Sequence, residues 1–146
     1  MSLKSEVLSA TKVAMKEKDK ARLTVLRGFS AAIKQREIDE QIELDDAGQL
    51  AVLDKLIKQR KDSESQFRDA GRDDLADKEA SELAILSGFL PKQLDENEIV
   101  ALIDKAIAEV GETGMSAMGK VMAIVKPQVQ GKADMGQVSQ LVKSKL

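Results

Sequence analysis

Apolar residues recur every three or four positions along almost the whole chain, which is the period of an α-helix. The pattern predicts helices over residues 2–16, 19–43, 49–70, 73–87 and 95–110. Two shorter helices are predicted between residues 115 and 146, with Gly131 between their apolar runs. No stretch alternates apolar and polar residues as a half-buried strand does. The sequence therefore predicts an all-α fold.

The helical pattern breaks at Phe89-Leu90-Pro91, because a residue that precedes proline is pushed out of the helical region. We place a domain boundary at this point. An N-terminal helical domain with long helices is predicted over residues 1–90. A small C-terminal module of three short helices is predicted over residues 91–146.

Caps and core faces can be assigned from the same pattern. The residues placed to cap helix N-termini are Ser2, Asp19, Asp73 or Asp74, and Asp95. The inward face of the second predicted helix is assigned to Leu23, Leu26, Phe29, Ile33, Ile38 and Ile42. Residues 58–66 of the third helix are polar on all sides. This stretch is expected to project or to be covered by another part of the protein.

The composition restricts the chemistry, because the 146 residues include no Cys and no His. Disulfides, thiolate or imidazole metal sites, and Ser-His or Cys-His nucleophile pairs are therefore excluded. We assign no catalytic residue, no metal ligand and no cofactor, and we favour a function without catalysis. Glu79 and Glu82 stand one turn apart, a spacing that suits a shared proton or a hard cation, but a structural or solvated role is favoured.

Basic side chains dominate the last part of the chain. After Gly114 the only acids are Asp134 and the terminal carboxylate, whereas five lysines occur. These lysines are Lys120, Lys126, Lys132, Lys143 and Lys145. The contrast with an acidic chain indicates a surface that meets an anion, and a purely solubilising surface is the alternative. Trp and Tyr are absent and the three Phe occupy core-like positions, which disfavours base stacking.

Membrane and compartment expectations follow from the apolar runs. None approaches the length of about 20 residues that a membrane span needs. The first twelve residues contain no apolar signal core. We therefore expect a cytosolic protein that does not contact membranes.

Several motifs resemble those of the YqeY proteins. They are Arg27 followed by Lys34 and Glu37, Ile57-Lys58-Gln59-Arg60-Lys61-Asp62-Ser63, Gly71-Arg72 and Asp74-Leu75 followed by Glu79 and Glu82, Phe89-Leu90-Pro91, Met118-Gly119-Lys120-Val121-Met122, and Gly131-Lys132-Ala133-Asp134. The resemblance implies an all-helical protein in two parts. Its C-terminal part is similar to the tail domain of the B subunit of the glutamine-dependent aspartyl/glutamyl-tRNA amidotransferase. In the Gly131-Lys132-Ala133-Asp134 corner, Gly131 is expected to supply a special backbone conformation, Asp134 to cap the last helix, and Lys132 to stay exposed.

The resemblance implies association with tRNA, and a family label of carbon-nitrogen ligase activity with glutamine as amido donor. Three hypotheses remain open. The chain binds tRNA, or accompanies a tRNA enzyme, through the five lysines. Alternatively, the acidic residues 37–46 and the polar middle of the third helix dock a protein partner, such as an aminoacyl-tRNA synthetase or an amidotransferase subunit. The weakest hypothesis is an autonomous amidotransferase, which would need Ser63, Ser65 or Ser116 as nucleophile and a lysine base.

Overall fold

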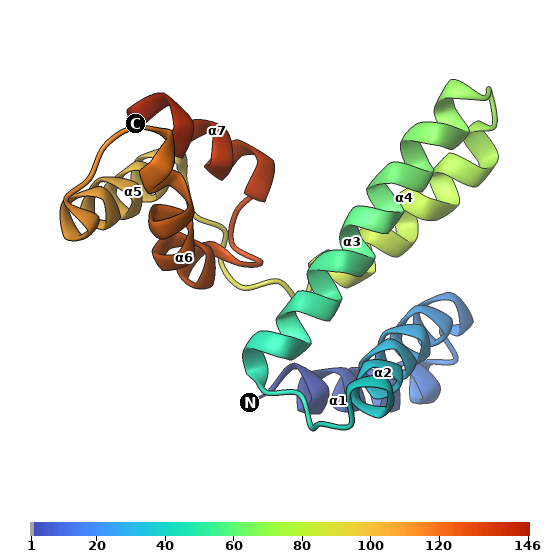
Figure 1. The fold of residues 1–146 in the computed structure, drawn as a ribbon. Helices are drawn as coiled ribbons and strands as arrows, with labels where there is room; N and C mark the ends of the chain where they lie inside the picture. Colours follow the sequence, from blue (N-terminus) through green and yellow to red (C-terminus); the bar gives the residue numbers. More distant parts are fainter. Residues whose placement is uncertain (1) are drawn as a thin grey trace. The chain divides into compact units, whose positions relative to one another are not determined.

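The computed structural model describes residues 2–146 and is helical (Figure 1). The elements are α1 (Leu3–Glu17), α2 (Lys20–Glu40), α3 (Asp46–Asp69), α4 (Asp73–Ser87), α5 (Glu96–Val110), the short 3₁₀ helix η1 (Met115–Ala117), α6 (Met118–Val129) and α7 (Met135–Lys145). No strand occurs within residues 2–146. The predicted all-α fold is confirmed.

The chain divides into two compact units, an N-terminal unit (Met1–Leu90) and a C-terminal unit (Pro91–Leu146). The dividing point coincides with Pro91, and residues 88–95 contain no helix. Each unit contains a hydrophobic cluster of its own.

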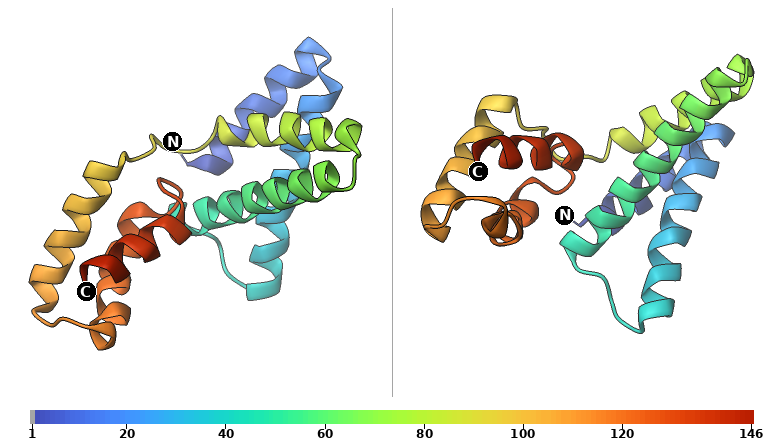
Figure 2. Two further views of the ribbon diagram at one scale, coloured as in Figure 1. Left: turned by 90° about the horizontal axis from the view of Figure 1, so that it is seen from above. Right: turned by 45° about the horizontal axis from the view of Figure 1, so that its top comes forward.

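The N-terminal unit consists of two helix hairpins, α1 with α2 and α3 with α4, whose helices run antiparallel (Figures 1 and 2). Its core is built from large apolar side chains that are at most 1% exposed, including Leu26, Phe29, Ile33, Leu53 and Leu86. Phe29 meets Phe89 edge to face, with ring centroids 6.1 Å apart and planes at 72°. This geometry is favourable for two aromatic rings, so the last residues of the unit complete its core.

The C-terminal unit packs α5, α6 and α7 around a separate core of branched residues. Ile103, Val121, Val125, Val138 and Val142 are fully buried there, as their helical spacing predicts. Pro127 lies inside the last turn of α6, and the helix ends two residues later at Val129. A proline in the last turn is compatible with a helix end, because the helix cannot continue its hydrogen bonds through it.

Side chains cap most of the helices. Ser2, Asp19, Asp95 and Asp134 each accept a hydrogen bond from a backbone N–H in the first turn of the helix that follows, as predicted. Such a cap stabilises a helix by about 1 kcal/mol. Asp45 caps α3 in the same way, so this helix begins three residues earlier than predicted.

The predicted cap of α4 is wrong. Arg72 occupies the capping position without a side-chain hydrogen bond, and Asp73 and Asp74 lie inside the first turn. There the two carboxylates face the positive end of the helix dipole, which is favourable without a capping bond.

The predicted inward face of α2 is wrong at its C-terminal end, where Ile38 and Ile42 are 60% and 53% exposed. Ile38 follows the buried Ile33 by five residues, which turns it about 140° away from the core at 100° per residue. Ile42 lies beyond the helix, because Gln41 adopts a left-handed conformation with φ 55° and ends α2. Phe67 is half-buried and lies outside the core cluster.

Candidate nucleic-acid interface

The five candidate lysines all lie in the C-terminal unit, on α6, on α7 and in the corner between them. Two of them form ion pairs with acids of the α5 region. Lys120 Nζ lies 2.9 Å from Glu112 Oε1, and Lys145 Nζ lies 3.0 Å from Asp104 Oδ1. Both pairs are partly exposed, so each contributes about 0–1 kcal/mol and can exchange for another anion.

The remaining three lysines are not neutralised by neighbours. Lys126, Lys132 and Lys143 make no ion pair with any residue from 2 to 146. Asp134 is the only acidic side chain on α6, α7 or the corner, and its carboxylate accepts the N–H of Gly136 at 2.9 Å as the cap of α7. The α6–α7 face therefore keeps free positive charge.

The solvent face of α6 has small residues near its two lysines. The exposed residues of this helix are Gly119, Lys120, Ala123, Lys126, Pro127 and Gln128. At 100° per residue, the two lysines lie about 120° apart around the helix, with Ala123 between them. A ligand can therefore approach the α6 backbone closely and still reach both ammonium groups.

The corner between α6 and α7 is fixed by the segment before α5. Gly131 is buried with φ +74°, a left-handed conformation that only glycine adopts without strain. Gln93 Nε2 donates to the Gly131 carbonyl at 2.7 Å, and the Leu94 N–H donates to the Lys132 carbonyl at 2.9 Å. The corner therefore holds the backbone of Lys132 in one position. Lys132 is half-buried, so the prediction that it stays exposed is wrong. Its neighbour Ala133 packs against the core cluster, which draws this part of the corner toward the unit's interior.

The two candidate lysines of α7 point in different directions. Lys143 and Lys145 are two residues apart, so they lie about 160° apart around the helix. Lys143 shares the exposed face with Gly136, Gln140 and Ser144, whereas Lys145 reaches α5. Lys120, Lys126 and Lys143 are thus exposed on α6 and α7, whereas Lys145 is engaged with Asp104 of α5.

The acidic pair of α4 has a structural partner. Arg60 Nε of α3 lies 3.1 Å from Glu82 Oε2 and 3.7 Å from Glu79 Oε2, and these side chains are 18–30% exposed. Within the described chain, Arg60 Nε and Glu79 Oε2 are buried atoms without a hydrogen bond. The guanidinium neutralises two neighbouring carboxylates between α3 and α4. This arrangement supports the structural role of Glu79 and Glu82.

Arg72 belongs to the exposed tip of the α3–α4 hairpin. Its Nε donates to Asp74 Oδ1 at 3.3 Å, and this hydrogen bond lowers the pKa of Asp74. Nearby, Arg68 Nη2 donates to Asp77 and to Glu64, each at 3.1 Å, and the two bonds raise the pKa of Arg68. Arg72 thus pairs with Asp74 on the exposed tip, beside the ion pairs of Arg68.

Glu37 occupies a polar junction in the N-terminal unit. Its Oε2 accepts from Lys4 Nζ at 2.9 Å and from the Leu44 N–H at 2.8 Å, and these bonds lower its pKa. The buried Gln49 completes the junction, because its Nε2 donates to the Leu44 carbonyl and its Oε1 accepts from the Lys4 N–H, both at 3.0 Å. The junction joins the start of α1, the end of α2 and the start of α3.

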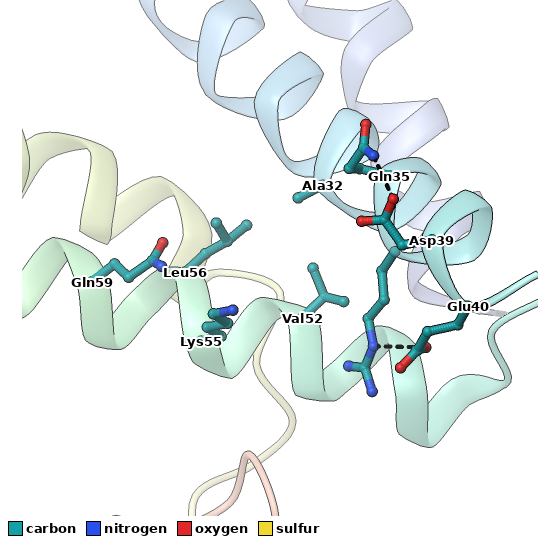
Figure 3. Close-up of a pocket in the computed structure, with 9 residues that line it drawn as sticks. Ala32, Gln35, Asp39, Glu40, Val52, Lys55, Leu56 and Gln59 are labelled. Atoms are coloured by element: carbon teal, nitrogen blue, oxygen red, sulfur yellow. Dashed lines mark hydrogen bonds and ion pairs between the residues drawn. The ribbon is translucent and has the colours of Figure 1, made fainter.

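A pocket of about 560 Å³ opens between α2 and α3 (Figure 3). Gln35 donates to Asp39 at 2.9 Å, and Arg36 donates to Glu40 at 3.1 Å, along its α2 side. The full lining is Ala32, Gln35, Arg36, Asp39, Glu40, Val52, Lys55, Leu56 and Gln59. Among residues 2–146, no group of three or more acidic side chains is placed to hold a metal ion.

A comparison with protein families decides the family. The model of the YqeY family, described as Yqey-like protein, matches residues 4–146 and so nearly the whole chain. The chain belongs to the YqeY family.

Relatives of this YqeY chain include proteins named Altered inheritance of mitochondria protein 41, mitochondrial. Those from Kluyveromyces lactis and Lachancea thermotolerans are 38% identical over 127 residues and 37% identical over 108 residues. The alignments cover 84% and 72% of this chain, but 64% and 58% of the relatives. The protein of the same name from Pyrenophora tritici-repentis is 31% identical over 124 residues, covering 84% of this chain and 68% of its own length.

These names contradict the predicted cytosolic location, because each of the three relatives is named as mitochondrial. The prediction relied on the missing apolar signal core. Mitochondrial transit segments are amphipathic and rich in Arg instead, so that criterion does not detect them. The names of these relatives therefore overturn the cytosolic prediction. No helix among the described residues combines the length and apolarity that a bilayer span requires.

Two features of this YqeY chain depend on its fold: a hydrogen-bonded junction that the sequence did not predict, and the arrangement of a basic region whose composition the sequence does show. The junction at Glu37 joins residues 33 apart in the chain, a separation that no local pattern reveals. A second basic region lies on α1 and α2, where residues 4–36 contain nine Lys or Arg and three acids. The count was a visible signal, but the sequence does not show how those side chains are arranged.

Proposed function

We propose that the C-terminal unit binds folded RNA of the tRNA type through the phosphate backbone. The observation that carries the proposal is the α6–α7 face, where Lys126, Lys132 and Lys143 lack ion pairs within the described chain and Asp134 is engaged as a cap. Lys120 adds a fourth cation whose pair with Glu112 is exposed. The resemblance of the C-terminal part to the amidotransferase tail domain, which implies association with tRNA, supports tRNA as the class of RNA.

The surface suits shape recognition. Gly119 and Ala123 leave room for a sugar-phosphate backbone next to α6, and lysines flank them. Double-stranded RNA is recognised mainly through its phosphates, its 2′-hydroxyls and its shape, because its deep groove hides the bases. Phosphate contacts position a protein without reading sequence, so the affinity should depend steeply on salt.

The test is a titration of the full chain with tRNA at two salt concentrations. We compare the unmodified protein with Lys126→Glu/Lys132→Glu. Binding of the variant should be at least about tenfold weaker at low salt, and its salt slope should fall by about one for each lysine lost. The matched control is Lys61→Glu/Lys78→Glu, which changes the charge of the chain equally at exposed positions of the N-terminal unit.

Two outcomes would end the proposal. Unchanged affinity in Lys126→Glu/Lys132→Glu means that these lysines only keep the protein soluble. An equal loss in Lys61→Glu/Lys78→Glu means that RNA responds to net charge and to no particular surface. Circular dichroism of each variant establishes that the helices are intact.

The pocket between α2 and α3 favours a second candidate, a protein adaptor. It is lined by Asp39 and Glu40 of the acidic region at one end and by Gln59 of the polar middle of α3 at the other. These are the two stretches that the adaptor hypothesis requires. Its volume of about 560 Å³ accommodates side chains of a partner protein, and Leu56 and Val52 supply an apolar floor.

The adaptor candidate is tested with a purified aminoacyl-tRNA synthetase or amidotransferase subunit after nuclease treatment. Gln59→Arg places a longer, charged side chain at the pocket and should weaken binding by about tenfold. Gln66→Arg makes the same change on an exposed part of α3 outside the pocket and serves as control. Binding that disappears with nuclease, or that ignores Gln59→Arg, contradicts an adaptor function of this pocket.

A further inference from the structure

The cations of α1 and α2 are mostly uncompensated. Lys4 pairs with Glu37 and Arg36 pairs with Glu40. The other seven basic residues of segment 4–36 make no ion pair with the described part of the chain, residues 2–146. They are Lys12, Lys16, Lys18, Lys20, Arg22, Arg27 and Lys34.

Three of these cations form a straight stripe on α2. Lys20, Arg27 and Lys34 are exposed and follow one another at intervals of seven residues. Seven residues are close to two helical turns, so the three side chains lie on one face at steps of about 10.5 Å. Ile33 and Phe29 are buried on the other side of the helix. The stripe therefore faces solvent over its whole length.

The adjoining flank of α1 mixes cations with large apolar side chains. Leu8 and Met15 are 56% and 48% exposed, and Lys12 and Lys16 are exposed beside them. At 100° per residue, these four side chains fall within about 100° of the helix surface. The two acids of α1, Glu6 and Glu17, fall on its opposite flank.

Contacts between the helices join the two surfaces. Arg27 Nη2 lies 3.8 Å from Met15 Sδ, and Lys4 Nζ lies 2.9 Å from Glu37 Oε2 further along the same hairpin. Because α1 and α2 run antiparallel, the stripe of α2 continues the cationic flank of α1 (Figures 1 and 2). We call this surface the basic seam. It comprises Leu8, Lys12, Met15 and Lys16 of α1 and Lys20, Arg27 and Lys34 of α2.

We propose that the basic seam binds an acidic amphipathic helix of a partner protein. Leu8 and Met15 are seven residues apart, so a helix lying along the seam covers both with apolar residues of the same spacing. Carboxylates on its two flanks then reach Lys12 and Lys16 on one side and Arg27 and Lys34 on the other. The charges orient the partner, and the covered apolar area contributes affinity.

The apolar residues of the seam distinguish this partner from RNA. A phosphate backbone would satisfy the cations but would gain little from Leu8 and Met15. Bases need aromatic faces for stacking, and Phe29, the aromatic residue of α2, is 1% exposed. The proposal concerns a different unit from the RNA proposal and does not depend on it.

The experiment uses the full chain labelled with ¹⁵N and a synthetic helical peptide. In the peptide, leucines occupy the a and d positions of three heptads, and glutamates flank them. A second peptide has the same composition in scrambled order. Amide shifts should change in α1 and α2 with the first peptide, and the scrambled peptide should bind at least about tenfold more weakly.

Two double variants separate the charged and apolar contributions. Lys12→Glu/Arg27→Glu and Leu8→Gln/Met15→Gln should each weaken binding of the ordered peptide by about tenfold or more. The matched control is Lys61→Glu/Lys78→Glu, an equal charge change at exposed positions of the same unit, and should bind within about twofold of the unmodified chain.

Three results would overturn the proposal. The first is equal affinity for the ordered and scrambled peptides, and the second is an equal loss in the control variant. The third is binding of tRNA or of anionic lipid vesicles at the seam that Lys12→Glu/Arg27→Glu abolishes and Leu8→Gln/Met15→Gln leaves intact. That result assigns the seam to a polyanion. Circular dichroism again establishes that each variant is folded.

Discussion

Gln49 is the buried polar residue of the N-terminal core, 4% exposed, and its side chain makes two hydrogen bonds. Gln49→Leu would leave the Lys4 N–H and the Leu44 carbonyl without these partners. We expect the free energy of unfolding to fall by about 1–3 kcal/mol, measured by urea denaturation. Gln59→Leu, on the exposed side of the same helix, should change it by less than about 0.5 kcal/mol. Equal effects of the two changes would contradict the role of Gln49.

Glu37 should make stability depend on pH. Its pKa is lowered mainly by the hydrogen bond from Lys4 and then by that from Leu44. A lowered folded-state pKa contributes stability that is full above the ordinary carboxyl value of about 4.3 and is lost as the pH falls toward the lowered value. In Glu37→Gln, the fall of unfolding free energy below about pH 5 should therefore be less steep. A series of urea denaturations between neutral and acidic pH measures this slope, with Glu43→Gln as control.

The structural role of a single residue could be predicted where that role depends on its neighbours in the sequence. The caps Ser2, Asp19, Asp95 and Asp134 each depend on a backbone N–H two or three residues away. The ion pair of Lys145 with Asp104 joins residues 41 positions apart, and the sequence does not show which residue either of them pairs with. The sequence therefore predicted only that this region is positively charged. The fold was needed to show which of the lysines are neutralised by an ion pair.

At the scale of the elements, the α3–α4 hairpin depends on Arg60. Arg60→Met would leave Glu79 and Glu82 facing each other, one turn apart and largely covered. We expect a loss of about 1–3 kcal/mol in unfolding free energy, because removing one partner leaves uncompensated charge. Adding Glu79→Gln and Glu82→Gln to Arg60→Met should recover most of that loss. Failure of the triple variant to recover would mean that packing of the Arg60 stem matters more than its charge.

The corner between α6 and α7 depends on Gly131. Gly131→Ala puts a side chain on a buried residue with φ +74°, which should cost about 1–2 kcal/mol. The variant should also bind tRNA more weakly, because the corner positions Lys132. Gly119→Ala is the control for stability, since nothing lies within 4 Å of the added carbon. It lies in a helix and should be neutral or stabilising by up to about 1 kcal/mol.

Element boundaries were predictable where apolar spacing and caps agree. The three helices of the C-terminal unit follow the predicted ranges because Ile103, Val125 and Val138 belong to regular apolar stripes. The end of α2 was missed because Ile38 and Ile42 are apolar and look like core residues. Ile38 follows Ile33 by five residues, and that spacing places it off the buried face of the helix. The start of α3 was missed because Asp45 and Asp46 look like part of an acidic loop.

At the scale of the whole molecule, the C-terminal unit should fold as a separate fragment. Its core cluster consists of residues from α5, α6 and α7, with Leu94 and Leu146 packed against it. A chain of residues 91–146 is near the lower size limit of domains that fold alone, so we expect a helical spectrum and a cooperative thermal transition. A fragment without a cooperative transition would contradict this expectation. A folded fragment would also show whether tRNA binding needs only this unit.

The core of the N-terminal unit is completed by its last residues, and this has a consequence during synthesis on the ribosome. Leu86 is buried in the core and Phe89 packs on Phe29, although 60 residues separate the two rings. A nascent chain that has not yet extended to these residues exposes the surface that Leu26 and Phe29 will later share. Such intermediates attract chaperones or aggregate. We therefore expect ribosome-stalled chains ending before residue 86 to be retained by chaperones, and chains in which Phe89 has left the exit tunnel to be released.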